Sequence, residues 1–343
     1  MNEVTIIVIV TVAVALIFDV INGFHDSANA IATIVSTRVL SPRFAVLWAA
    51  AFNFTAIFIF APKVANAISQ IVIINPSDPA FVYVVLAGLL GAIIWDLLTW
   101  YWGLPVSSSH ALIGGFAGAG IAYKGIHIIR WGIVGETMAF IPLAPMIGAV
   151  LGLIIMIAVY WIFRKWRPAK VDQLFRKGQL VSAALYSIGH GGNDAQKTMG
   201  IIVALLIAAG LFEPGKQLSI HSWDTLWIML SCHLALALGV ALGGWRIVET
   251  IGMKLAKLKP VHGFCAETAG AFTIFLATHL GIPISTTHTI SGSIIGVGST
   301  SNLAGIKWKT ASRIVIAWIV TIPFSALTAA ICFHLIYLVH RLF

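Results

Sequence analysis

The fold of this chain is decided by a polar stretch that occurs twice in an otherwise apolar sequence. Gly103–Gly120 reads GLPVSSSHALIGGFAGAG, Gly281–Gly298 reads GIPISTTHTISGSIIGVG, and seven of the 18 aligned positions are identical. A second pair precedes these: Gly23–Thr33 reads GFHDSANAIAT, and Gly191–Ile201 reads GGNDAQKTMGI. Matching polar breaks in the two halves of a membrane chain are typical of secondary transporters.

Composition places the chain in a membrane. Of its 343 residues, 59% are hydrophobic and 10% are charged, whereas soluble domains carry about 25% charged residues. Apolar segments long enough for a span of about 20 residues recur from end to end. We therefore expect an all-α, multi-pass protein of the plasma membrane (the inner membrane of a cell with two). The formal net charge is +9, and the basic residues lie between the apolar segments. This position indicates contact with lipid headgroups rather than with nucleic acid.

Two apolar segments carry polar, glycine-marked middles. As a straight helix, Val4–Leu40 would exceed a hydrocarbon core of about 30 Å. Its middle, Asn22–Asp26, reads NGFHD, and the second copy has GHGGND at Gly189–Asp194. We expect each helix to be broken there, within the membrane.

Basic loops indicate the orientation. Arg164–Lys177, Arg246–Lys259 and Arg38–Arg43 concentrate Lys and Arg, so the positive-inside rule makes them cytoplasmic. This puts the N-terminus on the outside.

The same rule predicts the domain organisation. The first half must cross the membrane an odd number of times, which inserts the second half upside down. We expect inverted repeats at residues 1–163 and 179–343, a cytoplasmic linker at 164–178, and both termini extracellular or periplasmic. Each repeat would contain a re-entrant helical hairpin, because PVSSSH and PISTTH are costly sequences to expose to lipid.

Carboxylates inside apolar segments are the first functional candidates. Asp26 and Asp194 align between the copies, and Asp96 and Glu267 also lie within apolar runs. A charge at the bilayer centre costs at least about 2.5 kcal/mol, so such groups usually face a cavity and bind a partner. Cations are the obvious partner, since Lys197 is nearly alone among basic residues in these segments. The alternative is that Asp26 and Asp194 cap helix N-termini at the breaks.

Hydroxyl clusters at the two tips are the second candidates. Each follows Gly-x-Pro and precedes a helical run, which is the order expected at a helix N-terminus. Such an end presents unpaired N–H groups and partial positive charge, and it binds phosphate-like anions. Capping alone is the other interpretation. The residues are Ser107, Ser108, Ser109, Ser285, Thr286 and Thr287.

Several aligned pairs leave their roles open. His110 and His288 align, and they fit either a structural lock or a proton or substrate role. Lys197 replaces Asn29, either as an ion-pair partner of Asp194 or as a charge for the anion. His25 aligns with Asn193, which suggests that the two halves have different tasks.

With these motifs assembled, the chain resembles the inorganic phosphate transporter (PiT) family. INGFHDSANAIAT at Ile21–Thr33, GHGGNDAQKTMGI at Gly189–Ile201 and the two PxSxxH tips match its paired signatures. The resemblance covers nearly the whole chain, and His25 resembles the bacterial low-affinity Pit branch. It implies symport of phosphate with sodium, protons or as metal–phosphate, and an inverted duplicated architecture. Some relatives have a long cytoplasmic insert where this chain has only Arg164–Lys177.

By motif position, the resemblance implies that Asp26, Asn29, Asp194 and the two hydroxyl clusters bind the substrate and ions. Glu267, in the sequence AETAGA, also matches a glutamate of the family. We therefore predict a phosphate symporter working by alternating access, without a cofactor and without a firmly assigned metal site. The predicted phosphate ligands are Ser107, Ser108, Ser109, Ser285, Thr286, Thr287, Asn29 and Lys197. The predicted residues for cation or proton coupling are Asp26, Asp194, Asn22, Asn193, Glu267, Asp96 and His25, and His110 and His288 are assigned to structure or gating.

The same residues help to distinguish between rival functions. Symport of sulfate or another tetrahedral oxyanion is the nearest alternative. An anion channel would not need duplicated buried carboxylates, and a hydrolase using Ser107–Ser109 with His110 lacks a Gly-x-Ser-x-Gly elbow. The coupling ion stays open between sodium, protons and metal–phosphate, and a homodimer also stays open.

Overall fold

The computed structural model describes residues 3–73, 78, 80–300 and 305–342, and within them the chain is helical. An isolated antiparallel bridge joins Val72 to Ile129. The prediction of an all-α fold is confirmed. The helices are α1 (Glu3–Ser36), α2 (Pro42–Thr55), η1 (Ala56–Phe58), α3 (Lys63–Ile68), α4 (Phe81–Tyr101), α5 (Ser108–Lys124), η2 (Ile126–Ile128), α6 (Trp131–Phe163), α7 (Pro168–Ala208), α8 (Trp223–Leu242), α9 (Trp245–Met253), α10 (Pro260–Leu280), α11 (Thr286–Ser299) and α12 (Trp308–Leu342).

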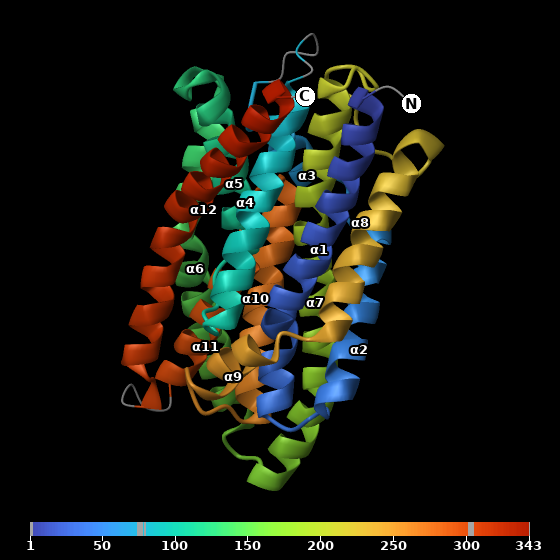
Figure 1. Ribbon diagram of the computed structural model, residues 1–343. Helices are drawn as coiled ribbons and strands as arrows, with labels where there is room; N and C mark the ends of the chain where they lie inside the picture. Colours follow the sequence, from blue (N-terminus) through green and yellow to red (C-terminus); the bar gives the residue numbers. More distant parts are fainter. Residues whose placement is uncertain (1–2, 74–77, 79, 301–304, 343) are drawn as a thin grey trace.

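The long helices run along one common axis (Figure 1). The start of α1 and the end of α12 lie at the same end of this bundle, whereas the short helix α9 lies across the opposite end. The first turns of α7 extend beyond the rest of the bundle at that opposite end. Residues 168–178 of the expected linker are these turns, so four residues, 164–167, separate α6 from α7.

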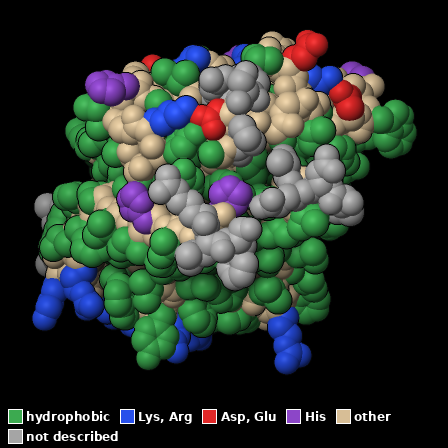
Figure 2. Space-filling model, turned by 45° about the horizontal axis from the view of Figure 1, so that its top comes forward, with side chains coloured by type: hydrophobic (Ala, Val, Ile, Leu, Met, Phe, Trp, Pro, Cys, Tyr) green, Lys and Arg blue, Asp and Glu red, His purple; other side chains and the backbone are tan. Residues whose placement is uncertain are grey.

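The outer surface of the bundle is suited to lipid. Among the described residues, five helices (α1, α4, α6, α8 and α12) are long and apolar enough to cross a membrane. Figure 2 shows a hydrophobic flank between two ends that carry the charged side chains, with Lys and Arg prominent at the end opposite the termini. Large apolar side chains of α6 and α12, such as Val150, Ile154 and Ile319, are exposed, which water would penalise and hydrocarbon does not.

The prediction of broken helices is wrong. α1 is continuous over 34 residues and α7 over 41 residues, and both pass through the glycine-marked stretches without interruption. The glycines instead allow close packing: a Cβ on Gly23 would lie 2.1 Å from the carbonyl oxygen of Leu236, and one on Gly191 2.3 Å from that of Asn53. Because other helices meet the polar side chains of these stretches, the backbone does not need to unwind.

Two helical hairpins, α4–α5 and α10–α11, bring the PVSSSH and PISTTH segments into the bundle interior, where residues 105–120 and 283–294 are buried. Each second helix packs against the last helix of the other half. On α5, Gly118 closely approaches Ala326 of α12, and on α11, Gly292 and Gly296 approach Pro145 and Ala149 of α6. The two halves of the chain therefore interlock around their hairpins.

Candidate functional site

Two polar stripes face each other at the centre of the bundle. α1 carries Asn22, Asp26 and Asn29, and α7 carries His190, Asp194 and Lys197, in each case at positions i, i+4 and i+7. This spacing places three side chains on one face of a continuous helix. All six are at most 2% exposed, and α1 packs directly against α7.

The hairpin tips supply two helix N-termini to the same place. The Ser107 hydroxyl accepts the backbone N–H of His110 at 3.3 Å, and the Ser285 hydroxyl accepts that of His288 at 3.2 Å. Capping by the first hydroxyl of each tip is therefore observed, and the following two hydroxyls are left for other partners. The rings of His110 and His288 meet edge to face with centroids 4.8 Å apart, which shows that the tips touch.

Lys197 connects both tips to the carboxylate of Asp194. Its Nζ donates to Asp194 Oδ1 at 2.5 Å, to Ser109 Oγ on the first tip at 2.5 Å and to the Ile284 carbonyl on the second at 2.8 Å. The side chain is 1% exposed. A buried ammonium with three acceptors is well compensated. The ion pair with Asp194 is therefore observed, and the role of Lys197 as a charge for the anion stays a prediction.

Asn29 and Asp26 hold the second tip from the side of α1. The Asn29 amide nitrogen donates to Thr287 Oγ1 at 2.9 Å and to Thr286 Oγ1 at 3.3 Å. Thr287 in turn donates to Asp26 Oδ1 at 3.4 Å, and Thr286 donates to Asp194 Oδ2 at 3.2 Å. The two threonine hydroxyls thus link the aligned carboxylates of the two halves.

His190 belongs to this centre although the sequence gave it no role. Its Nδ1 lies 2.6 Å from Asn53 Oδ1, and the Asn53 amide nitrogen donates to the Ala49 carbonyl. The oxygen of Asn53 therefore faces the ring, so Nδ1 carries the proton and Nε2 presents its lone pair in the neutral form. Nε2 lies 2.9 Å from Asp194 Oδ2.

The arrangement of Asp26, His190 and Asp194 is able to hold a cation. One ligand atom from each of the three lies within 4.8 Å of the other two. A lone pair beside two carboxylates is electrostatically unfavourable unless a proton or a metal ion lies between them. Reading α7 as a continuous helix would have revealed His190, because it lies one turn before Asp194 on the same face.

Asp96, Asn22 and Asn193 lie around this centre with unused acceptor atoms. Both carboxylate oxygens of Asp96, and the amide oxygens of Asn22 and Asn193, are buried without a hydrogen-bond partner among the described residues. The Asn193 nitrogen donates to Thr278 at 2.9 Å. His25 contacts Asp26 Oδ1 at 3.0 Å and Thr99 Oγ1 at 3.3 Å. Buried acceptors without donors are costly, and they are available to a ligand.

Glu267 is placed in a separate polar cluster. It accepts hydrogen bonds from Thr33 at 2.6 Å, from Gln179 at 2.9 Å and from Ser182 at 2.5 Å. Thr33 lies one turn beyond Asn29 on α1, so the cluster is a neighbour of the centre rather than part of it. These three partners were not predicted, since they lie between 85 and 234 residues away in sequence.

Tyr186 is a further residue that the sequence did not single out. It is fully buried on α7, and its hydroxyl donates to the Thr286 carbonyl at 2.9 Å. The hydroxyl thereby anchors the backbone of the second tip to α7.

An apolar helical bundle with a buried charged centre between two hairpin tips is the architecture of an integral membrane transport protein. The phosphate transporter family model matches residues 22–171 and 163–329. The chain therefore belongs to the phosphate transporter family, as its motifs predicted, and it is a transporter rather than an enzyme.

Relatives cover almost the full chain. A probable low-affinity inorganic phosphate transporter of Rhizobium meliloti is 51% identical over 324 residues, 94% of each chain. One of the same description from Bacillus subtilis is 43% identical over 336 residues, 98% of this chain and 99% of the relative. A solved structure described as the sodium-dependent phosphate transporter shares the fold, with a TM-score of 0.87, 24% identity and coverage of 97% of this chain and 99% of that one.

Proposed function

We propose that this protein takes up inorganic phosphate together with a cation by alternating access. The observation that carries the proposal is the convergence of both hairpin tips on Lys197, directly beside the carboxylates of Asp26 and Asp194. Anion donors and cation acceptors thus share one buried centre. In such a medium of low dielectric constant, each ion lowers the cost of binding the other.

The phosphate side of the centre consists of donors. The N-termini of α5 and α11 add backbone N–H groups and positive dipole ends, and Ser108, Ser109, Thr286 and Thr287 add hydroxyls. Lys197 and the amide of Asn29 complete the set. These groups now bond to one another, so a bound oxyanion would take over bonds that already exist. Ser107 and Ser285 are assigned to capping the tips.

The cation side consists of acceptors. Asp26, Asp194 and the Nε2 of His190 are the proposed ligands, with the unused oxygens of Asn22, Asn193 and Asp96 nearby. Backbone carbonyls of the glycine-marked stretches are not proposed as ligands, since they are committed within the continuous helices α1 and α7. His25 is proposed to orient the Asp26 carboxylate, and Glu267 to influence the cation through Thr33.

The ion itself is proposed at the level of a cation. The solved neighbour is described as sodium-dependent, and two carboxylates suit sodium. The lone pair of His190 suits a proton or a divalent ion in a metal–phosphate complex. Phosphate is preferred to sulfate as the anion, because the family and its relatives are named for phosphate.

We further propose that residues 1–163 and 179–343 are inverted repeats with re-entrant hairpins. Support comes from the exchange of partners, in which α5 packs on α12 and α11 packs on α6 through aligned glycines, and from α1 beginning where α12 ends (Figure 1). The basic end would be cytoplasmic and both termini external. The surrounding membrane is proposed to be the plasma membrane, and the protomer number is left to experiment.

Uptake into proteoliposomes tests the proposal. Labelled phosphate would be measured with separate sodium, proton and magnesium gradients, and with sulfate as competitor. We expect Asp26→Asn and Asp194→Asn to abolish gradient-driven uptake, whereas Glu249→Gln, at an exposed pair with Lys254, leaves it unchanged. Normal uptake by both aspartate variants would refute the assignment, and uptake that ignores every cation gradient would indicate a channel.

A further inference from the structure

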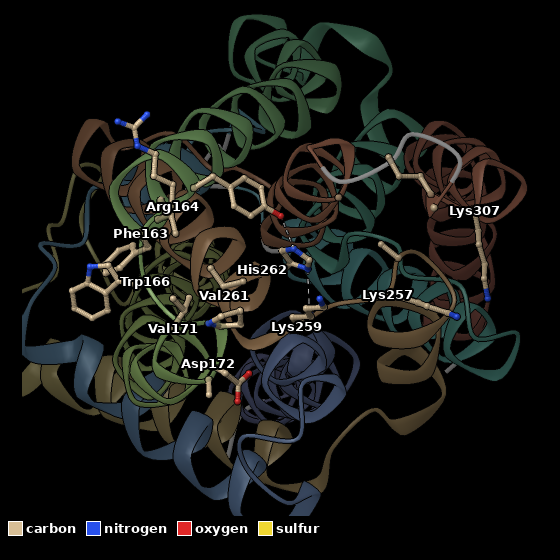
Figure 3. A pocket seen from close by; sticks show the side chains of 18 residues that line it. Phe163, Arg164, Trp166, Val171, Asp172, Lys257, Lys259, Val261, His262 and Lys307 are labelled. Atoms are coloured by element: carbon tan, nitrogen blue, oxygen red, sulfur yellow. Dashed lines mark hydrogen bonds between the residues drawn. The ribbon is translucent and has the colours of Figure 1, made fainter.

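A large cavity opens at the basic end of the bundle, away from the transport centre. It has a volume of about 1150 Å³ and lies between the end of α6, the start of α7, the segment joining α9 to α10, and residues 305–307 (Figure 3). In Figure 3, His262 lies in the middle of these elements, next to the backbone of Lys259. None of the residues assigned to phosphate or cation lines this cavity.

The rim of the cavity carries uncompensated positive charge. Arg164, Lys257, Lys259 and Lys307 line it, and none of them forms an ion pair with a described residue. The carboxylate in the described lining, Asp172, already accepts from Arg176 Nε at 2.8 Å. In Figure 3 the Arg164 guanidinium points away from His262, so the three lysines and a neutralised acid make the site complementary to an anion.

The interior of the cavity is apolar and not suited to a small hydrated ion. Val159, Phe163, Val171, Val261 and Ile306 are among its lining residues. Half-exposed tryptophans of the same end, such as Trp166, correspond to the aromatic belt found at membrane interfaces. The cavity thus combines an interfacial charged rim with a hydrophobic interior.

A second, apolar groove lies next to the cavity. It has a volume of about 510 Å³ between α6, α11 and α12, and Leu255 lines it while the next residue, Ala256, lines the cavity. The backbone N–H of Lys307 donates to the Leu255 carbonyl at 3.1 Å, so the two spaces share this wall. Exposed residues of α12 such as Val315 open the groove toward lipid.

We propose that the cavity binds the phosphate headgroup of an anionic diacyl phospholipid and that one acyl chain lies in the groove. The three lysines recognise the headgroup charge, and the apolar lining and the groove recognise the chains. Inorganic phosphate or a soluble phosphorylated metabolite would gain nothing from the groove, which is why the lipid is the favoured occupant.

Lipid titration of the purified full chain tests the headgroup part. Dioleoyl-phosphatidylglycerol would be added to delipidated protein in detergent, and bound lipid counted by native mass spectrometry against dioleoyl-phosphatidylcholine. A basic residue near an anionic lipid is worth about fivefold in binding. Combining Lys257→Gln, Lys259→Gln and Lys307→Gln should therefore weaken phosphatidylglycerol binding by at least about tenfold. The matched control, Lys165→Gln with Lys170→Gln and Lys177→Gln, removes equal charge from the same end outside the cavity and should retain binding.

A second pair of variants tests the groove. Val315→Trp should fill the groove and weaken binding of the dioleoyl lipid severalfold, whereas Ile316→Trp, at the next position, which is also exposed but lies outside the groove lining, should not. Equal binding of the two lipids, equal loss in the lysine control, or displacement of the lipid by millimolar inorganic phosphate or glycerol phosphate would each overturn the proposal. The last result would identify the cavity as a site for soluble phosphorylated ligands.

Discussion

Removing the ammonium of Lys197 should damage stability and transport in separable ways. Lys197→Met keeps an unbranched side chain, one atom shorter, but leaves Asp194 with Thr286 and His190 as its remaining close partners. Breaking a buried ion pair costs about 3–5 kcal/mol, because the remaining charge stays desolvated. We expect a loss of this size in the free energy of unfolding, and Asp194→Asn should cause a similar loss.

The double variant distinguishes a structural pair from a transport site. Replacing both residues removes both charges, so the double variant should be more stable than the sum of the single losses predicts, by about 2 kcal/mol or more. All three variants should lose phosphate uptake in proteoliposomes, since Lys197→Met removes the cationic donor of the anion and Asp194→Asn removes a carboxylate of the proposed cation site. Stability would be followed by thermal denaturation of purified protein, with the exposed pair Glu249–Lys254 mutated as a control worth about 0–1 kcal/mol. Uptake by the double variant at the wild-type rate would show that the pair is merely structural.

Three other perturbations have expected outcomes. Gly292→Ala and Gly296→Ala would place a Cβ 2.1 and 2.0 Å from carbonyl oxygens of α6, so each should lower the free energy of unfolding by about 1–3 kcal/mol. Gly135→Ala, with open space around it, should be tolerated. Equal stability of all three variants in thermal denaturation would contradict the interlocked packing. Glu267→Gln should raise the cation concentration for half-maximal uptake by about tenfold while the phosphate dependence at saturating cation stays within about twofold, and an unchanged cation curve would remove Glu267 from coupling. Burial raises the pKa of the Asp78 carboxyl, but hydrogen bonds from Lys124 and Tyr123 outweigh this and hold its pKa below the ordinary value. Its contribution to stability is therefore present above about pH 4 and lost as pH falls through the lowered pKa, so Asp78→Asn should flatten the acid side of the profile of melting temperature against pH, and an unchanged profile would contradict this.

The sequence predicted the features that depend on local patterns. Apolar segments of membrane length, the hydroxyl cap at each hairpin tip and the burial of the aligned carboxylates are all observed in the structure. These depend on hydropathy and on short-range capping geometry, which neighbouring residues determine.

The wrong prediction of broken helices came from two glycines whose roles are decided by distant helices. Gly23 and Gly191 read as helix breakers, since glycine weakens an isolated helix by about 1 kcal/mol. In the bundle, the close approach of α8 and α2 decides their role. The same misreading hid His190, which lies inside the stretch where the helix was expected to be broken, so it was not placed on one face with Asp194.

The differences between the two polar stripes give a physical reason for coupling. Asp26 and Asp194 are equivalent, so two identical halves would give this centre two negative charges and no cation. Lys197, in the place of Asn29, cancels one of them, and with a neutral His190 the stripes keep a formal charge of −1. Phosphate entering this buried centre would still meet net repulsion, which at low dielectric is a cost of several kcal/mol. In the proposed mechanism, a cation on Asp26 and His190 would remove that repulsion, and Lys197 would make one monovalent cation enough to do so.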